Sequence, residues 1–178
     1  MKLLQRKLAS PIGDMLLVTD EAGCVRALDF EGYQAHLHRL LHLHYGNYEL
    51  RDSAQNSDVA TRLQRYFSGD LHALDDIAVA NNGSALQQQA WAALRQIPPG
   101  HVLSYSELAA QLGRPKAARM VGGINASNPV AIIVPCHRVV AKNGDLRGYA
   151  WGLERKRWLL AHEGAEHHKY GLARLTGA

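Results

Sequence analysis

The sequence has few cysteines and no long hydrophobic run. Two cysteines in 178 residues exclude a framework of several disulfides and are typical of a reducing compartment, although a single disulfide stays open. No apolar run approaches the roughly 18 residues that a membrane-spanning helix needs. The first residues, MKLLQRKLASPIG, contain no sustained apolar core and match a secretory signal poorly. We therefore expect a cytoplasmic protein that does not associate with membranes.

The chain also lacks internal repeats and low-complexity segments, which excludes repeat architectures. Its length is sufficient for one large domain or two small ones with cores of their own. The stretch NNGS at 81–84 is typical of a linker or loop. We therefore predict an N-terminal domain at 1–80 and a C-terminal domain at 81–178.

Acidic residues are scarce in the second of these domains. Residues 81–178 contain twelve Lys and Arg against five Asp and Glu, a net charge of +7. Residues 1–80 contain eight basic and eleven acidic residues, a net charge of −3. A basic domain predicts a polyanionic partner such as nucleic acid, although a well-solvated basic surface would give the same count.

The N-terminal domain has the pattern of a small sheet followed by helices. MLLVT and CVRALDF are short β-favouring runs separated by DEAG, which predicts antiparallel strands and makes Cys24 a core residue. Two helices follow, with predicted buried faces made of Leu37, Leu40 and Leu41 in the first and of Val59, Leu63, Tyr66 and Phe67 in the second. The second helix is expected to end near Gly69, and DDIAVA at 75–80 to return as a strand.

Four histidines crowd the first of these helices, namely His36, His38, His42 and His44. His38 and His42 are four residues apart, a spacing that can hold a metal. Solvent-facing histidines are the simpler interpretation, and we adopt it.

Two capping-box patterns mark helix starts in the C-terminal domain. Ser84 is followed by Gln87, and Ser104 is followed by Glu107. The first helix places Leu86, Ala90, Ala93, Leu94 and Ile97 on one face and is expected to end at the PPG of 98–100.

The segment 104–126 predicts a helix-turn-helix. The short helix YSELAAQL is followed by Gly113 as a C-cap, and Pro115 suits the first turn of a second helix, KAARMVGGINAS. Gly122 and Gly123 inside that helix cost about 1 kcal/mol each relative to Ala. Close approach of another molecule would explain them, and so would packing between helices.

The stretch PVAIIVPCHRVVAKNG brings a thiol, an imidazole and a guanidinium together after a buried run. A cysteine thiol is a strong nucleophile once a base removes its proton. His137, next to Cys136, is the candidate base, and Glu163 could orient its imidazole. A buried structural cysteine and a solvated carboxylate remain the simpler alternatives. Glu163 ends an amphipathic helix with a predicted face of Leu153, Trp158, Leu159 and His162.

Together these motifs resemble the bacterial O6-alkylguanine-DNA alkyltransferases. The resemblance is carried by PCHRVV at 135–140, by SYSELAAQLGRPKAARMVGGINASNP before it and by GYAWGLERKRWLLAHEG after it. It is dense from about 84 to 164 and looser in the N-terminal half. It implies an α/β N-terminal domain of ribonuclease-H-like type and a mainly α C-terminal domain with the helix-turn-helix.

The resemblance also implies a reaction. The alkyl group of an O6-alkylguanine in duplex DNA would pass irreversibly to Cys136, after the damaged nucleotide is flipped out of the stack. His137 would act as the base, directly or through a water, with Glu163 orienting it. Tyr105 would aid nucleotide rotation and protonate the leaving guanine, and Asn128 would hold the turn around the cysteine. The thioether product cannot be cleaved, so each chain would react once.

Further roles follow from the same resemblance. Arg119 would fill the place of the flipped base, and helix 115–126 would enter the minor groove with a slim face at Ala118 and Gly122. Ser106 and Arg114 are candidates for phosphate contacts. The alkylguanine pocket is assigned to Val139, Tyr149, Ala150 and Trp151. Trp151 stands where others have Gly, which suggests exclusion of large alkyl groups.

No metal or cofactor is expected. Some family members bind zinc through N-terminal Cys and His, but Cys24 is the only cysteine in that half. The expected partner is double-stranded DNA, bound by a monomer, and cooperative binding is left open.

Two other classes of protein are weighed. A DNA-binding module without chemistry would not need Cys136. A Cys–His hydrolase usually has its two residues distant in sequence, which the adjacent Cys136 and His137 fit poorly.

Overall fold

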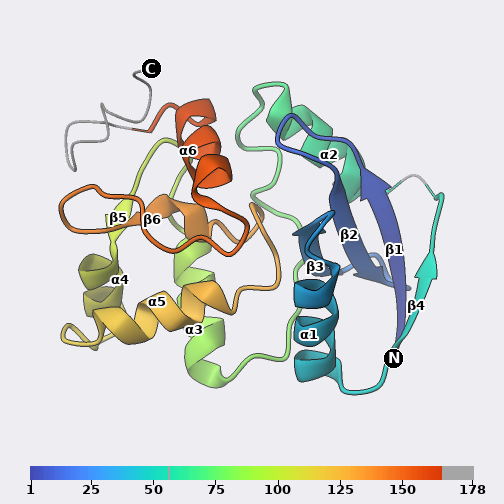
Figure 1. The fold of residues 1–178 in the computed structure, drawn as a ribbon, viewed down its shortest axis with the longest axis horizontal. Helices are drawn as coiled ribbons and strands as arrows, with labels where there is room; N and C mark the ends of the chain where they lie inside the picture. The colour runs from blue at the N-terminus through green and yellow to red at the C-terminus, as the bar shows by residue number, and fades with distance from the viewer. Residues whose placement is uncertain (56, 166–178) are drawn as a thin grey trace. The chain divides into compact units, whose positions relative to one another are not determined.

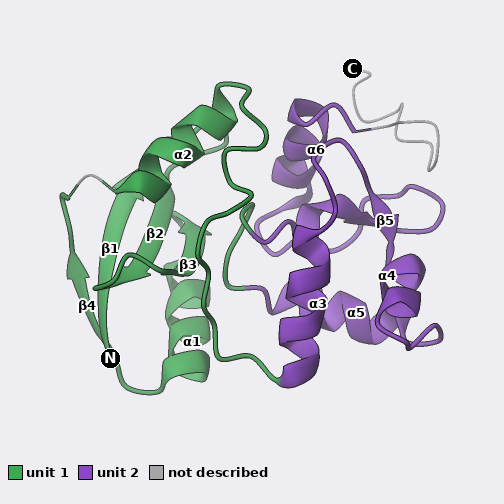
Figure 2. Cartoon of the chain, turned by 180° about the vertical axis from the view of Figure 1, so that it is seen from behind, with its two compact units in different colours: residues 1–84, 129–133 green, residues 85–128, 134–178 purple. Residues whose placement is uncertain are grey.

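The computed structural model describes residues 1–55 and 57–165 and divides into two compact units (Figures 1 and 2). Unit 1 consists of residues 1–84 together with 129–133, and unit 2 of residues 85–128 and the described chain from 134 to 165. The predicted domains were continuous, with a boundary between residues 80 and 81. In the structure, residues 129–133 instead belong to unit 1. The assignment of separate functions to 1–80 and 81–178 stays a prediction.

Unit 1 is built on a four-stranded sheet of order β3-β2-β1-β4. The strands are β1 (Lys2–Leu8), β2 (Met15–Asp20), β3 (Val25–Phe30) and β4 (Glu49–Asp52). The first three pair antiparallel, with Met15 opposite both Leu8 and Phe30, which confirms the predicted small antiparallel sheet. β4 adds to β1 in parallel. Its sequence, ELRD, has no apolar alternation, so no strand was predicted there.

Apolar side chains are buried on both faces of this sheet. Leu16 and Val18 of β2 form a core cluster with Leu37 and Leu41 of α1 (Gln34–Tyr45). Leu17 points to the opposite face, because successive side chains of a strand alternate. There it lines a cavity together with Val59 of α2 (Asp58–Phe67). Both predicted helices of this unit are thus present, one on each side of the sheet (Figure 1).

The outer edge of β3 is covered by two segments distant in sequence. Val25 donates to Ala78 O and accepts from Ala80 N, at 2.9 and 3.0 Å. Leu28 donates to Pro129 O at 3.0 Å and accepts from Ala131 N at 2.9 Å. The strand predicted at 75–80 is therefore wrong, since only an isolated bridge between Val25 and Val79 forms there.

Unit 2 is mainly helical. Its elements are α3 (Ala85–Arg95), β5 (Leu103–Ser104), α4 (Tyr105–Gln111), α5 (Ala118–Ala126), a 3-10 turn (Cys136–Arg138), β6 (Val139–Val140) and α6 (Leu153–His162). α3 buries Ala90, Trp91 and Leu94, and the Trp91 indole donates to Ile124 O of α5 at 3.3 Å. Over the described ranges, no helix combines the length and apolar character needed to cross a membrane.

Two predictions about helices in unit 2 are corrected. The second helix of the predicted pair begins at Ala118 and not at Pro115, because Ala117 N closes a turn onto Arg114 O at 2.9 Å. In α6 the predicted face is only partly right. Leu159 is buried and Trp158 stacks on His162, but Leu153 is 42% exposed, and the other buried positions of the helix are Lys156 and Leu160.

A short parallel pairing positions the candidate site. Leu103 pairs with Val139 and Ser104 with Val140. α4 starts directly after Ser104, whose hydroxyl accepts from Glu107 N at 3.1 Å, while the Glu107 carboxylate accepts from Ser104 N at 2.7 Å. This confirms the predicted capping box. The pairing therefore holds the start of α4 beside the turn that carries Cys136.

Candidate active site

Cys136 begins the 3-10 turn and is 5% exposed. Asn128, fully buried, donates from Nδ2 to Val134 O at 2.9 Å and to Cys136 Sγ at 3.3 Å. Val134 O also accepts from Cys136 N at 2.8 Å, which closes a tight turn around Pro135. The Asn128 amide thus contacts both the sulfur and the backbone that presents it.

The chain leading to this turn contains an unusual backbone conformation. Ile132 has a φ of 65°. Across it, Ile133 N donates a hydrogen bond to Ala131 O at 2.6 Å. A β-branched residue with positive φ costs about 1–3 kcal/mol and persists only where its surroundings enforce it. Ile132 is 1% exposed within a buried run, so packing holds it in this conformation.

Burial raises the pKa of the Cys136 thiol, and this effect outweighs the three that oppose it. The hydrogen bond from Asn128 and the positive charge of Lys156 both lower it. The thiol is therefore protonated at neutral pH. Nucleophilic chemistry at this sulfur needs a base that accepts the proton.

His137 is the imidazole closest in sequence, and it is completely buried. Its Nε2 lies 2.9 Å from Glu163 Oε1, so the two residues that the sequence predicted to cooperate do meet. With Glu163 ionised, Nε2 carries the hydrogen and donates it to the carboxylate. Among the described residues, the buried Nδ1 has no hydrogen-bond partner. Its lone pair is the one available to accept a proton.

Glu163 is held by two partners. Arg138 donates from Nε to Oε2 at 2.9 Å and from Nη2 to Oε1 at 2.8 Å. Burial alone would raise the pKa of this carboxyl, but the positive charges and hydrogen bonds of His137 and Arg138 together place it well below its usual range. Gly100 has a φ of 84°, and a Cβ there would lie 3.0 Å from Glu163 O. The PPG turn thus packs directly on the end of α6.

Tyr105 and Lys156 share one acceptor. The Tyr105 hydroxyl donates to Arg147 O at 2.7 Å, and Lys156 Nζ donates to the same oxygen at 3.2 Å. Lys156 Nζ also lies 5.7 Å from the centre of the Tyr105 ring. Burial, followed by the charge of Cys136, raises the pKa of Tyr105 to about 12. The phenol is therefore protonated at neutral pH.

Lys156 is the residue that the sequence interpretation missed. It is completely buried, and burial lowers its pKa to about 8, against the opposing effect of Cys136. A signal was present, because Lys156 lies three and seven residues before Leu159 and Glu163, on one helical face. It was hidden in the charged run ERKR, which is typical of a solvated surface.

The four residues predicted to line an alkylguanine pocket are all in unit 2, but differ in exposure. Val139 and Trp151 are completely buried, Tyr149 is 9% exposed, and Ala150 is intermediate. The Tyr149 and Trp151 rings make an edge-to-face contact with centroids 5.2 Å apart. The two aromatic rings therefore pack directly against each other.

The predicted DNA-contacting residues lie on α4, on α5 and on the segment between them. Ser106, Arg114 and Arg119 are exposed, while Ala118 and Gly122 are intermediate. A Cβ added at Gly122 would meet no atom within 4 Å, and the same holds for Gly123. Packing between helices therefore does not explain these glycines.

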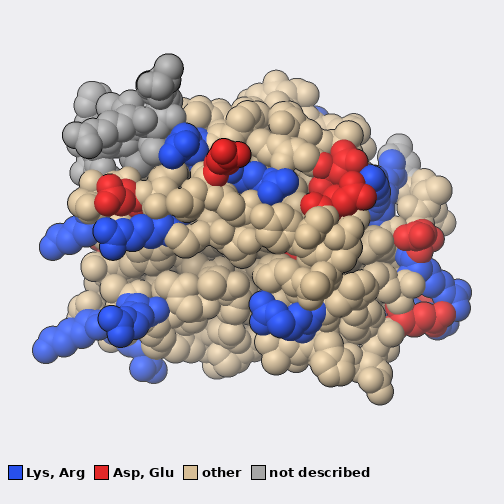
Figure 3. Space-filling view, in the orientation of Figure 1, with Lys and Arg blue, Asp and Glu red and all other residues tan. Residues whose placement is uncertain are grey.

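Basic side chains gather at this end of unit 2. Figure 3 shows Lys and Arg over the region where Figure 1 draws α4, α5 and the loop before α6. The exposed basic residues of these segments are Arg114, Lys116, Arg119, Lys142 and Arg147. A polyanion would be attracted to such a surface.

The cysteine and histidines of unit 1 differ from expectation. Cys24 is not a core residue but half-buried in the turn between β2 and β3, where its N–H donates to Asp20 Oδ1 at 3.0 Å. His44 is buried, and His36 forms a hydrogen bond with Asp29 at 2.8 Å. Of the four histidines predicted to face solvent, only His38 and His42 are exposed. In the described ranges, no group of three or more His, Cys, Asp or Glu is placed to hold a metal.

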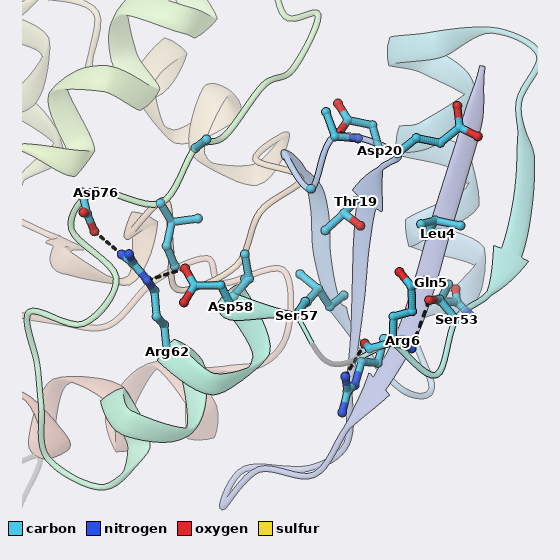
Figure 4. Close-up of a pocket in the computed structure, with 18 residues that line it drawn as sticks. Leu4, Gln5, Arg6, Thr19, Asp20, Ser53, Ser57, Asp58, Arg62 and Asp76 are labelled. Carbon is cyan, nitrogen blue, oxygen red and sulfur yellow. Dashed lines mark hydrogen bonds and ion pairs between the residues drawn. The ribbon is translucent and has the colours of Figure 1, made fainter.

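Unit 1 also contains a cavity of about 450 Å³ between the sheet and α2 (Figure 4). Among its charged residues, Arg62 of α2 contacts both Asp58 and Asp76. None of the predicted site residues lines it.

In unit 2, the geometry therefore combines a buried thiol, a His–Glu pair that follows it directly in sequence, and exposed basic residues on α5 and the adjoining loops. The DNA-binding domain of 6-O-methylguanine DNA methyltransferase matches residues 85–165. A methylated-DNA–protein-cysteine methyltransferase of Salmonella typhimurium is 45% identical over 166 residues, covering 92% of this chain and 97% of its own. A relative of the same name from Methanosarcina acetivorans is 40% identical, covering 88% and 95%.

A solved structure agrees with these relatives. Mycobacterium tuberculosis OGT, crystallised in complex with DNA, matches with a TM-score of 0.73 and 34% identity, covering 90% of this chain and 92% of its own. The chain belongs to the methylated-DNA–protein-cysteine methyltransferase family, which confirms the resemblance drawn from the sequence.

Proposed function

We propose that this protein repairs O6-alkylguanine in duplex DNA by irreversible transfer of the alkyl group to Cys136. The observation that carries the proposal is the buried Cys136 thiol, held by Asn128 and followed directly by the His137–Glu163 pair. Membership in a family named for transfer from methylated DNA to a protein cysteine supports it.

The chemistry balances without a metal or cofactor. The thiol proton passes to His137 Nδ1, directly or through a water, and Glu163 stabilises the resulting imidazolium. The Cys136 thiolate then attacks the alkyl carbon, so that an S–C bond forms as the C–O6 bond breaks. The electron pair of the broken bond stays with guanine, which takes up a proton. The thioether has no leaving group that these residues could activate, so each chain reacts once.

The alkylated nucleotide would have to leave the base stack before reaction. Tyr105 is the proposed proton donor to the leaving guanine, in keeping with its protonated phenol. Exposed Arg119 at the start of α5 is proposed to occupy the space that the nucleotide leaves.

α4 and α5 are proposed to act as a helix-turn-helix that enters the minor groove. The open space around Gly122, with Ala118 one turn before it, would allow the helix to approach the DNA closely. Ser106 and Arg114 would contact phosphates. The protein would act as a cytoplasmic monomer, with a ribonuclease-H-like N-terminal domain.

Val139, Tyr149, Ala150 and Trp151 are proposed to surround the flipped alkylguanine. The buried, tightly packed Trp151 ring is expected to limit the size of the alkyl group. Comparable transfer rates from benzylguanine and methylguanine DNA would contradict this limit.

Intact-protein mass after mixing with duplex DNA that carries one O6-methylguanine tests the proposal. We expect a gain of one methylene, mapped to Cys136 and never exceeding one per chain. Cys136→Ser should show no gain, and Cys24→Ser, the matched control for a free thiol, should react like the wild type.

Two further measurements separate the other two classes. DNA binding that is retained in Cys136→Ala, without any alkyl acceptance by the wild type, would indicate a binding module. Repeated turnover of a thioester or peptide substrate would indicate a hydrolase.

A further inference from the structure

Arg138 is buried beside the proposed base but has no role in the chemistry described so far. It is 6% exposed, and its side chain donates three hydrogen bonds to buried acceptors. Two form a fork onto the Glu163 carboxylate, and the third runs from Nη1 to Ile97 O at 2.6 Å. Such a planar, bidentate pairing fixes both oxygens of the carboxylate.

The fork changes the charge that His137 experiences. A buried carboxylate that faced only an imidazole would favour the imidazolium, because the pair would then be neutral. Here Arg138 already neutralises Glu163. A proton on His137 would leave a net positive charge in the buried trio, so the imidazole is favoured in its neutral form.

The charged groups around His137 act in opposite directions, and Lys156 acts in the same direction as Arg138. From α6 come Glu163, which favours the proton, and buried Lys156, which opposes it. The turn itself contributes Arg138, which also opposes it, and the protonated Cys136 thiol. The buried residues of α3, which packs against this turn, are apolar. Burial is the largest effect and lowers the pKa of His137 further.

We propose that Arg138 is a positioning residue for alkyl transfer, which neutralises and orients Glu163 so that His137 stays unprotonated with Nδ1 open to the Cys136 proton. The inference rests on the proposed function, because it assigns the base of that reaction. Arg138 touches neither DNA nor the reacting atoms in this scheme. It acts through Glu163, whose fixed oxygens hold the hydrogen of the imidazole on Nε2.

The pH dependence of single-turnover alkyl transfer tests the proposal. Arg138→Met removes the charge and keeps an unbranched, apolar side chain. We expect the acid limb of its rate profile to move to higher pH by at least about one unit. At a fixed pH on this acid limb, the rate should fall about tenfold relative to the wild type and should recover on raising the pH. Arg138→Lys keeps the charge without the fork, so its acid limb should stay near that of the wild type.

Arg26 in unit 1 offers a matched control. It also forms a two-bond pair with a carboxylate, from Nε and Nη2 to Asp20 Oδ2 at 2.9 and 2.8 Å. Arg26→Met should leave the rate profile unshifted. If Arg138→Met is slower at every pH without a shift, Arg138 is only structural and the proposal fails. If the wild type transfers no alkyl group, the proposed function itself fails.

A second measurement does not depend on the stability of Arg138→Met. Nitrogen NMR of the histidine-labelled wild type, with His137 assigned from a His137→Gln spectrum, reports the protonation state directly. We expect a neutral ring with hydrogen on Nε2 at neutral pH. A doubly protonated His137 under these conditions would overturn the inference even if transfer occurs.

Discussion

The two units bury different kinds of side chains. Among the described residues, the buried polar or charged side chains of unit 1 are Asp29 and His44. Those of unit 2 are Ser104, Asn125, Asn128, His137, Arg138, Lys156 and Glu163. Buried charges are costly unless they are paired. Unit 2 thus concentrates its costly groups around one cysteine, whereas unit 1 resembles an ordinary apolar core.

Replacing a carboxylate in each unit gives the largest expected contrast. Glu163→Gln leaves Arg138 buried without its counter-charge, which should lower the free energy of unfolding by about 3–5 kcal/mol. It should also abolish most alkyl transfer, because His137 loses the group that stabilises its charged form. Asp20→Asn weakens a pair nearer the surface and should cost only about 1 kcal/mol.

Urea unfolding and single-turnover transfer of both variants measure this contrast. Equal losses of stability would show that burial does not distinguish the two carboxylates.

The buried Lys156 gives the next largest expected effect, which is a dependence of the free energy of unfolding on pH. Its pKa falls from 10.5 in the unfolded chain to about 8 in the folded protein. Below pH 8 both states carry the proton, and the folded state bears the full cost of the buried charge. Between pH 8 and 10.5 the unfolded chain binds more protons, so the free energy of unfolding rises with pH. The rise is on the order of 3 kcal/mol.

Lys156→Met should remove this rise. The variant should be more stable than the wild type at neutral pH, and the two should converge as the pH approaches 10.5. Tyr105, whose pKa is raised, destabilises both proteins at alkaline pH and cancels in the difference. Cys136 does not cancel fully, because the charge of Lys156 lowers its pKa in the wild type alone. Unfolding in urea across this range is the measurement, and a constant difference would contradict it.

Arg119 on α5 and Arg39 on α1 are both exposed helix arginines, one in each unit. Replacing each one in turn compares the contributions of the two units to DNA binding. Arg119→Ala should weaken binding to duplex DNA by about 1–2 kcal/mol and reduce its dependence on salt. Arg39→Ala on α1 should change neither. Fluorescence anisotropy at several salt concentrations gives both quantities, and equal effects would place DNA on both units.

Gly122→Ala has the smallest expected effect and acts in two directions. Ala should stabilise α5 by up to about 1 kcal/mol, since its Cβ meets nothing within 4 Å. It should nevertheless weaken DNA binding, because the added methyl group occupies the face proposed to enter the groove. Thermal unfolding and DNA titration of one variant suffice. Unchanged affinity would remove Gly122 from the interface.

Local signals allowed much of this molecule to be predicted from its sequence. The capping box at Ser104 and Glu107 depends on residues three apart, and it forms as expected. The pairing of His137 with Glu163 was anticipated because a resemblance supplied the long-range information. β4 and the return of 129–133 to unit 1 were not, since both depend on pairing between distant segments.

The buried charges were harder to predict for a different reason. Lys156 stands in a run of charged residues and Arg138 carries a charge itself, and hydrophobic patterning assigns such residues to the surface. Only the arrangement of carbonyls and carboxylates around them makes burial tolerable, and that arrangement is a property of the fold.

The segment 129–131 has a consequence for dissecting the protein. Its hydrogen bonds with Leu28 cover an edge of the unit 1 sheet, although it lies far from β3 in sequence. A fragment cut after Ser84 would therefore expose the N–H and C=O groups of Leu28 on β3, and an open strand edge recruits other chains. The separated N-terminal half is expected to self-associate through β3, and adding a peptide that spans 129–133 should suppress the aggregation.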